Sequence, residues 1–151
     1  MNPYPRFALM IAVSTVIMYG LMYLNTYALD HVYFSETRAF MALIMGAAMA
    51  AVMLLFMRRM YVSRRANVPV LLAALVAFCG ALWLVRSQAT IDDVSWMKAM
   101  IPHHSIAILT SERASLEDPR VRELAGRIIE TQRREIDEMK RLIADLDKKG
   151  G

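Results

Sequence analysis

The sequence predicts an all-α membrane protein: three transmembrane helices followed by an extracytoplasmic antiparallel helical hairpin. Three long stretches without charge occupy the first part of the chain, and a charged, amphipathic stretch follows them. An α-helix rises about 1.5 Å per residue, so each stretch is near or above the roughly 30 Å of a bilayer core. We expect helices at about 7–29, 39–57 and 68–85 in a membrane domain of residues 1–87, and the hairpin in residues 88–151.

The first apolar stretch follows one basic residue, Arg6, as the apolar part of a signal peptide does. However, it is long for that role, is rich in Tyr and Met, and lacks a clear cleavage site of small residues. We therefore expect it to remain in the membrane as the first helix.

The net charge of +4 is concentrated in residues 1–85, where six Arg stand against Asp30 and Glu36, whereas residues 86–151 carry 12 basic and 12 acidic side chains. Four of the arginines lie between the second and third stretches, at 58, 59, 64 and 65. The positive-inside rule places this loop in the cytoplasm, with the N-terminus and Arg6. The loop 30–38 and the tail then face the periplasm of a bacterial inner membrane. The charge indicates topology, and we expect no nucleic-acid partner.

The tail is expected to form two helices joined by a tight turn. The first helix runs to about Leu116, and its N-cap is one of three polar residues, Thr90, Asp92 or Asp93. Asp118 caps the second helix, with Pro119 at its first helical position, and that helix runs to about residue 147. Pro102 lies inside the first helix, where we expect a kink.

A cluster of potential soft-metal ligands lies in the first tail helix: Met97, Met100, His103 and His104. At 100° per residue, Met97, Met100 and His104 fall within an arc of about 60°, with His103 at its flank. Thioether sulfur favours Cu(I) over hard cations, and imidazole also suits copper. The alternative is a helical core in which Met is ordinary filler.

The second tail helix has an apolar stripe that contains one polar residue, Gln132. Burying an unpaired amide costs a few kcal/mol, so Gln132 needs a partner. A turn centred near residue 118 predicts these facing pairs: His104 with Gln132, Met97 with Met139, and Met100 with Ile136, beside Glu135. Polar residues of one helix would then meet the His and Met residues of the other.

A hairpin alone leaves half of this stripe exposed. Two hairpins would bury it in a four-helix bundle, so we expect a homodimer with metal sites inside or at the edge of the bundle. The alternative is a hairpin that leans on the membrane or on another protein.

The tail resembles the CopM-like family over roughly residues 92–146. The resemblance rests on Met97-x-x-Met100-Ile-x-His103-His104 and on Leu124-Ala-x-x-Ile-Ile-x-x-Gln132-x-x-Glu135-Ile-x-x-Met139. It implies a ferritin-like fold, extracytoplasmic binding of Cu(I) or Ag(I), and a role in copper tolerance. It implies metal ligands at Met97, Met100, His103, His104 and Met139, with Gln132 and Glu135 at polar positions of less defined role. A copper exporter or a periplasmic copper carrier would be a fitting partner.

The second apolar stretch carries a row of methionines four residues apart, Met41, Met45, Met49, Met53 and Met57. A ladder that passes Cu(I) across the membrane is one interpretation. We favour packing, because steps of four turn the row by about 40° each and so wrap it around the helix. The lone cysteine, Cys79, is also expected to be a packing residue. In the outer loop, His31 is either an accessory ligand, a residue that docks the hairpin, or part of a solvated turn.

The sequence argues against an enzyme, because it has no nucleophile–base pair, P-loop or dinucleotide motif, and lacks the Glu-x-x-His pairs of di-iron bundles. We expect a membrane-anchored binding protein that sequesters or delivers Cu(I) or Ag(I) outside the cytoplasm. The alternative is a membrane adaptor or sensor whose hairpin associates with another protein without metal.

Overall fold

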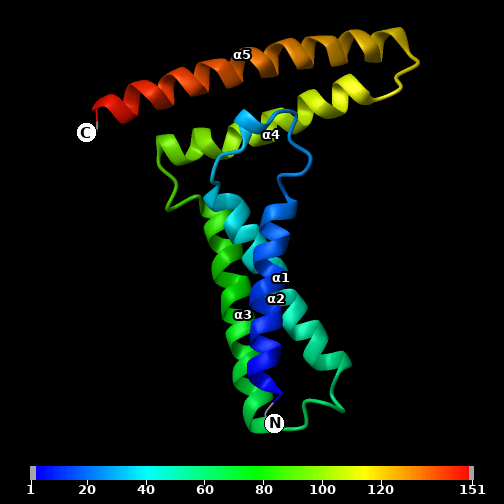
Figure 1. Cartoon of the computed structure of the whole chain (residues 1–151), viewed down its shortest axis with the longest axis vertical. Coiled ribbons are helices and arrows are strands. Elements are labelled where there is room, and N and C mark those ends of the chain that lie inside the picture. Colours follow the sequence, from blue (N-terminus) through cyan, green and yellow to red (C-terminus); the bar gives the residue numbers. More distant parts are fainter. Residues whose placement is uncertain (1–2, 150–151) are drawn as a thin grey trace. The chain divides into compact units, whose positions relative to one another are not determined.

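The computed structural model describes residues 3–149, which form only helices and connecting loops (Figure 1). The elements are α1 (Tyr4–Leu21), η1 (Leu29–His31), α2 (Glu36–Phe56), α3 (Arg64–Ser87), α4 (Asp93–Arg113) and α5 (Pro119–Lys149). The all-α prediction is confirmed for the described residues. The chain divides into two compact units. One contains α1, α2 and α3, and the other contains α4, α5 and the segment Tyr23–Glu36.

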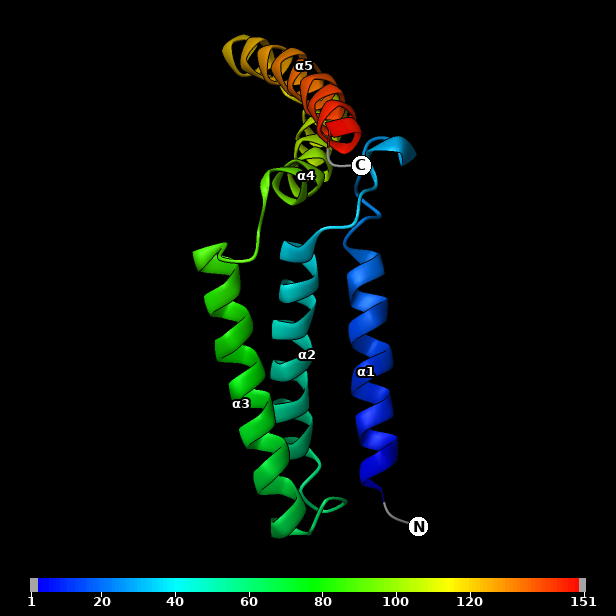
Figure 2. The same ribbon diagram turned by 90° about the vertical axis from the view of Figure 1, so that its left-hand side faces the viewer.

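The three helices of the first unit are each long and apolar enough to cross a membrane, as the sequence predicts. They run side by side (Figures 1 and 2). Large apolar side chains cover their outer surfaces; Val16 and Val76, for example, are each 71% exposed. A surface of this kind is suited to hydrocarbon, and helices that satisfy their own backbone hydrogen bonds can enter it.

The first helix is shorter than predicted: α1 ends at Leu21, whereas the sequence predicted an end at residue 29. Ala28 has an extended backbone, and the Tyr27 amide donates to Ser105 Oγ of α4 at 2.7 Å. The uncharged stretch therefore continues past the end of α1 into a loop, and this loop forms a hydrogen bond with α4. The other two helices begin slightly earlier than predicted, at Glu36 and Arg64.

Aromatic and amide groups join the three helices near the start of α1. Phe7, Leu54 and Tyr61 are buried in one apolar cluster, and the Phe7 and Tyr61 rings meet edge to face at 5.1 Å between centroids. The Tyr4 hydroxyl donates to Asn67 Oδ1 at 2.8 Å, and Asn67 Nδ2 donates to the Tyr61 carbonyl at 2.6 Å. These bonds satisfy the polar groups that pack at this end of the unit.

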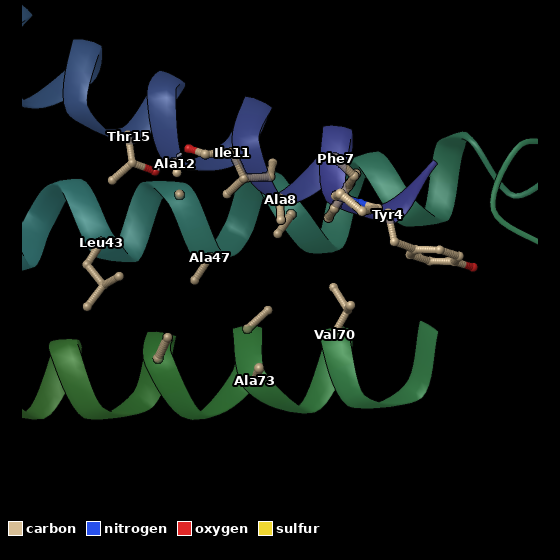
Figure 3. Close-up of a pocket in the computed structure, with 15 residues that line it drawn as sticks. Tyr4, Phe7, Ala8, Ile11, Ala12, Thr15, Leu43, Ala47, Val70 and Ala73 are labelled. Carbon is tan, nitrogen blue, oxygen red and sulfur yellow. Dashed lines mark hydrogen bonds between the residues drawn. The ribbon is translucent and has the colours of Figure 1, made fainter. Parts of the chain in front are cut away.

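A cavity of about 660 Å³ lies among α1, α2 and α3 and is lined mostly by small apolar side chains (Figure 3). Thr15 of α1 borders it, and its hydroxyl donates to the Ile11 carbonyl at 2.8 Å. A Cβ added to Gly46 of α2 would clash with the Thr15 hydroxyl, whereas nothing lies within 4 Å of the same position at Gly80. Gly46 thus allows α1 and α2 to approach closely.

In the second unit, α4 and α5 lie side by side and share one apolar core (Figure 1). The core is formed by Met97, Ile101, Ile108, Ile136, Met139 and Ile143. Asp92 caps α4 by accepting from the Ser95 amide at 2.7 Å, and this bond lowers the pKa of Asp92. Asp118 lies just before α5 and binds the Arg120 side chain and amide, which lowers the pKa of Asp118.

Residues 23–36, here called the strap, pack against the α4–α5 pair within the same unit. Ser105 is fully buried, and its hydroxyl accepts from the Tyr27 amide and lies 3.0 Å from His31 Nδ1. Asp30 accepts from Lys140 Nζ of α5 at 2.6 Å, and Tyr33 packs against the shared core. The strap therefore closes one side of the helix pair.

Candidate metal site on α4 and α5

The candidate site is centred on His104, which α4 holds against α5. His104 Nδ1 lies 3.0 Å from the Met100 carbonyl, one turn earlier, and Nε2 lies 2.8 Å from Glu135 Oε2. The His104 side chain is 12% exposed and that of Glu135 is 43% exposed. The imidazole is thus fixed at both nitrogens, at a place that solvent can reach from the Glu135 side.

The hydrogen bonds of His104 define what the site can do. A carbonyl and a carboxylate both accept, so both contacts are hydrogen bonds only when both ring nitrogens carry hydrogen. Two acceptors therefore face the ring, which donates to one of them when it is neutral and to both when it is protonated. If a cation replaced the hydrogen on Nε2, the bond from Nδ1 to the Met100 carbonyl would still hold the ring, as second-shell partners commonly do at metal sites.

The structure changes the pairing that the sequence suggested. We expected His104 to face Gln132, but it meets Glu135, and Gln132 Nε2 donates to the same Oε2 atom at 3.4 Å. Met97 and Met139 share one buried core, as the predicted pairing implies. Gln132 and Glu135 lie about one turn apart on the same side of α5, so the His104 side chain can reach Glu135 while the Met97–Met139 pairing is kept.

Three methionines lie in or against the shared core of α4 and α5. Met97 and Met139 are 4% and 6% exposed, and the half-buried Met100 packs against the same core. His103 is exposed, and its ring centroid lies 6.1 Å from that of His104. The helix pair thus carries one imidazole fixed beside one carboxylate, three thioethers in or against the shared core, and a second, exposed imidazole next to His104.

These residues do not form a site for a hard cation. Within residues 3–149, no group of three or more His, Cys, Asp or Glu side chains is placed to hold a metal ion. Oxygen-rich sites need several carboxylates, and this site has only Glu135. The other donor types that the helix pair carries are sulfur and imidazole, which soft ions accept.

His31 is held by the strap, away from this group. Its Nδ1 lies against Ser105, which is about 100° around α4 from His104, and Nε2 lies 4.0 Å from Asp30. Burial, together with the charge of Lys140, lowers the pKa of His31 and favours the neutral ring. His31 thus contacts α4 within the unit that contains the helix pair.

Ser105 was not singled out from the sequence, although it joins the strap to α4. Its only signal is a hydroxyl among the apolar positions of that helix, between Ile101 and Ile108. A fully buried hydroxyl needs partners, which here come from the strap.

Comparison with known proteins finds similarity in the second half of the chain. Residues 86–150 match the family described as a domain of unknown function, DUF305. An uncharacterized protein of Acanthamoeba polyphaga mimivirus is 42% identical over 64 residues, which cover 41% of this chain and 42% of that protein. The chain thus spans less than half of that relative, and no solved structure matches. The segment that carries α4, α5 and every candidate ligand except His31 is therefore similar to the DUF305 family, whose description assigns no function.

Proposed function

We propose that this protein is anchored in a bacterial inner membrane and binds Cu(I) or Ag(I) on the extracytoplasmic side, to sequester the ion or deliver it to an exporter or a periplasmic carrier. The observation that carries the proposal is the fixed His104 imidazole, held by the Met100 carbonyl beside a core that contains the Met97 and Met139 thioethers. The resemblance of the tail to the CopM-like family supports the same chemistry.

The proposed binding step exchanges one cation for another. The incoming ion takes the place of the hydrogen on His104 Nε2, and the released proton passes to solvent through the exposed side of Glu135. The thioethers of Met97, Met100 and Met139 supply soft donors nearby, and His103 supplies an exposed imidazole for the ion's arrival. Neither the ion nor a ligand changes oxidation state.

The arginines support the proposed topology. Arg58 and Arg59 follow α2 in the loop, and Arg64 and Arg65 begin α3, so this loop is expected in the cytoplasm. Three spans then place the α4–α5 pair, the strap and His104 outside the cytoplasm. A binding site on the extracytoplasmic side would capture copper before the ion enters the cytoplasm.

The test is a competition titration of the detergent-purified protein with Cu(I) against a chromogenic chelator under reducing conditions. We expect the wild type to compete, and the double variant His103→Ala/His104→Ala to lose at least about tenfold in affinity. The matched control is His31→Ala, which removes a histidine of the strap. Thermal unfolding without metal shows whether each variant keeps its fold.

A second variant separates binding from packing. Met97→Leu/Met139→Leu keeps the volume of the core and removes two sulfurs, so its stability should stay close to wild type while Cu(I) affinity falls. If the wild type and all variants bind Cu(I) equally weakly, the metal proposal is wrong and the alternative of an adaptor or sensor is favoured. That alternative draws on the exposed apolar residues of α5, Leu124 and Leu142.

A further inference from the structure

The α4–α5 pair has one covered side and one open side. The strap covers the side of Ser105. Trp96 and His103 lie about 180° and 160° around α4 from Ser105, and both are exposed. On α5, five residues that recur along the helix lie within an arc of about 40° around its axis and so form one line. The open face is formed by Trp96 and His103 together with this line, which is Leu124, Ile128, Glu135, Leu142 and Leu146.

The open face is too apolar to be an ordinary solvent-facing surface. Leu124 and Leu142 are 48% and 46% exposed, and Trp96 is 50% exposed. Contiguous exposed apolar side chains on a soluble unit commonly mark an interface. The face contains the edge of the metal site, because Glu135 lies in the middle of its α5 line.

The α5 line is symmetric about Glu135. Leu124 and Leu146 lie equally far before and after Glu135 in the sequence, and so do Ile128 and Leu142. A second line, beside the first, carries charges of opposite sign on the two sides of this centre. Arg127 and Arg134 precede it, and Glu138 and Asp145 follow it.

We propose that the open face binds a second copy of this chain, with the two α5 helices antiparallel and the two-fold axis at Glu135. This arrangement places Arg134 near Glu138 of the second copy and Arg127 near its Asp145, each pair offset by about 3 Å along the helices from exact opposition. Every contact then occurs twice, as a two-fold interface requires. A membrane surface would instead favour a uniformly basic rim, whereas this rim carries both signs.

A hollow in the open face fits the same arrangement. It has a volume of about 400 Å³ and lies between α4 and α5, where Trp96, Leu142 and Leu146 line it. The two-fold operation brings Leu124 and Ile128 of the second copy to this end of the face. Apolar side chains that are exposed in one copy thus meet the hollow of the other.

The second copy would also complete the candidate metal site, and this step rests on the proposed function. Within the described residues of one chain, no group of three or more His, Cys, Asp or Glu side chains is placed to hold a metal ion. Because His104 bonds Glu135, the axis passes close to both residues. Two copies therefore bring two His103–His104–Glu135 sets together, so that one ion could take imidazoles from both chains.

The interface is tested by charge reversal, measured by sedimentation velocity in detergent with a metal chelator present. We expect the wild type to be a dimer. Arg134→Glu and Glu138→Arg should each raise the dimer dissociation constant about tenfold or more, because like charges then face each other. The double variant Arg134→Glu/Glu138→Arg should restore the dimer.

Mixing the two single variants separates contacts between chains from contacts within one helix, where the same residues are four positions apart. With a different affinity tag on each variant, we expect the mixture to form a heterodimer, since every opposed pair then has opposite charges. Unchanged dimers in all samples, a monomeric wild type, or single variants that mixing does not rescue would each overturn the proposed interface.

Copper binding is measured separately on the same samples. The proposal expects the monomeric Arg134→Glu variant to bind Cu(I) more weakly than the wild-type dimer, although its own ligands are intact. Equal affinity per chain would overturn the two-chain site and leave the proposed function standing. A wild type that dimerises without binding Cu(I) would overturn the proposed function and leave the interface standing.

Discussion

Ser105 bonds the strap at two points where it crosses α4. Its hydroxyl accepts from the Tyr27 amide, and its own hydrogen can point to His31 Nδ1, which accepts when the ring is neutral. Both contacts are made by a side chain that is fully buried. A buried donor left without a partner costs more than the bond itself contributes.

Replacing Ser105 with Ala should therefore destabilise the unit that contains the strap by about 1–3 kcal/mol. Urea unfolding of the protein in detergent, followed by tryptophan fluorescence, measures the change. Ser115→Ala is the matched control, because Ser115 is exposed in the loop before α5. Equal effects of the two substitutions would contradict the role assigned to the Ser105 hydroxyl.

The stability of the strap should also depend on pH through His31. Burial lowers the pKa of His31 from its ordinary value of 6.5, and Lys140 adds to this, while Asp30 and Asp137 oppose it. A histidine with a lowered folded-state pKa stabilises the fold above the unfolded value, and this contribution is lost as the pH falls below it. We expect the Tyr27 amide to exchange faster at pH 5.5 than at pH 7.5, after correction for intrinsic rates.

Hydrogen exchange with mass spectrometry provides that measurement. His31→Asn keeps an acceptor for the Ser105 hydroxyl but does not titrate in this range, so its corrected exchange rate should change little between the two pH values. An identical pH dependence in wild type and variant would show that another group controls the strap.

At the scale of elements, Gly46 sets how closely α1 and α2 approach. A methyl group at this position meets the Thr15 hydroxyl, which already bonds within its own helix. We expect Gly46→Ala to destabilise the three-helix unit by about 1–3 kcal/mol, even though Ala is the better helix former. Gly80→Ala is the control, since its Cβ would meet nothing within 4 Å. The midpoint of thermal unfolding in detergent measures the difference. A higher midpoint for Gly46→Ala than for Gly80→Ala would refute this packing.

The sequence predicts elements where local chemistry defines them. The three apolar stretches match α1, α2 and α3, and the N-cap of α4 is one of the three residues considered, Asp92. The sequence-based prediction is wrong where contacts between residues far apart in the chain determine where a helix ends. Residues 23–29 carry no charge, so the sequence extends the first helix through them. In the structure the helix ends at Leu21, and the Tyr27 amide bonds Ser105, 78 positions away.

The candidate site shows the same division. The spacing of Met100 and His104 identifies their shared face on α4, because one turn of helix fixes it. Gln132 and Glu135 both lie on the side of α5 that meets His104. The sequence alone does not decide which of the two side chains bonds the imidazole, so the His104–Glu135 hydrogen bond could not be predicted from it.

For the whole molecule, the distribution of arginines predicts which loops face the cytoplasm. Two exposed serines test this in a Cys79→Ser background: Ser63, between α2 and α3, and Ser115, between α4 and α5. A membrane-impermeant maleimide should label Ser115→Cys in spheroplasts and label Ser63→Cys only after permeabilisation. The reverse pattern would place the candidate metal site in the cytoplasm.

The strap makes the unit that carries the candidate metal site discontinuous in the sequence. The region similar to DUF305 begins at residue 86, but Tyr27, Asp30 and His31 bind the same helix pair from between α1 and α2. A fragment cut at residue 86 would leave Ser105 facing water. Anyone who transplants the α4–α5 pair into a soluble scaffold should therefore graft residues 23–36 alongside it, and recombination that moves the tail alone would separate it from part of its own fold.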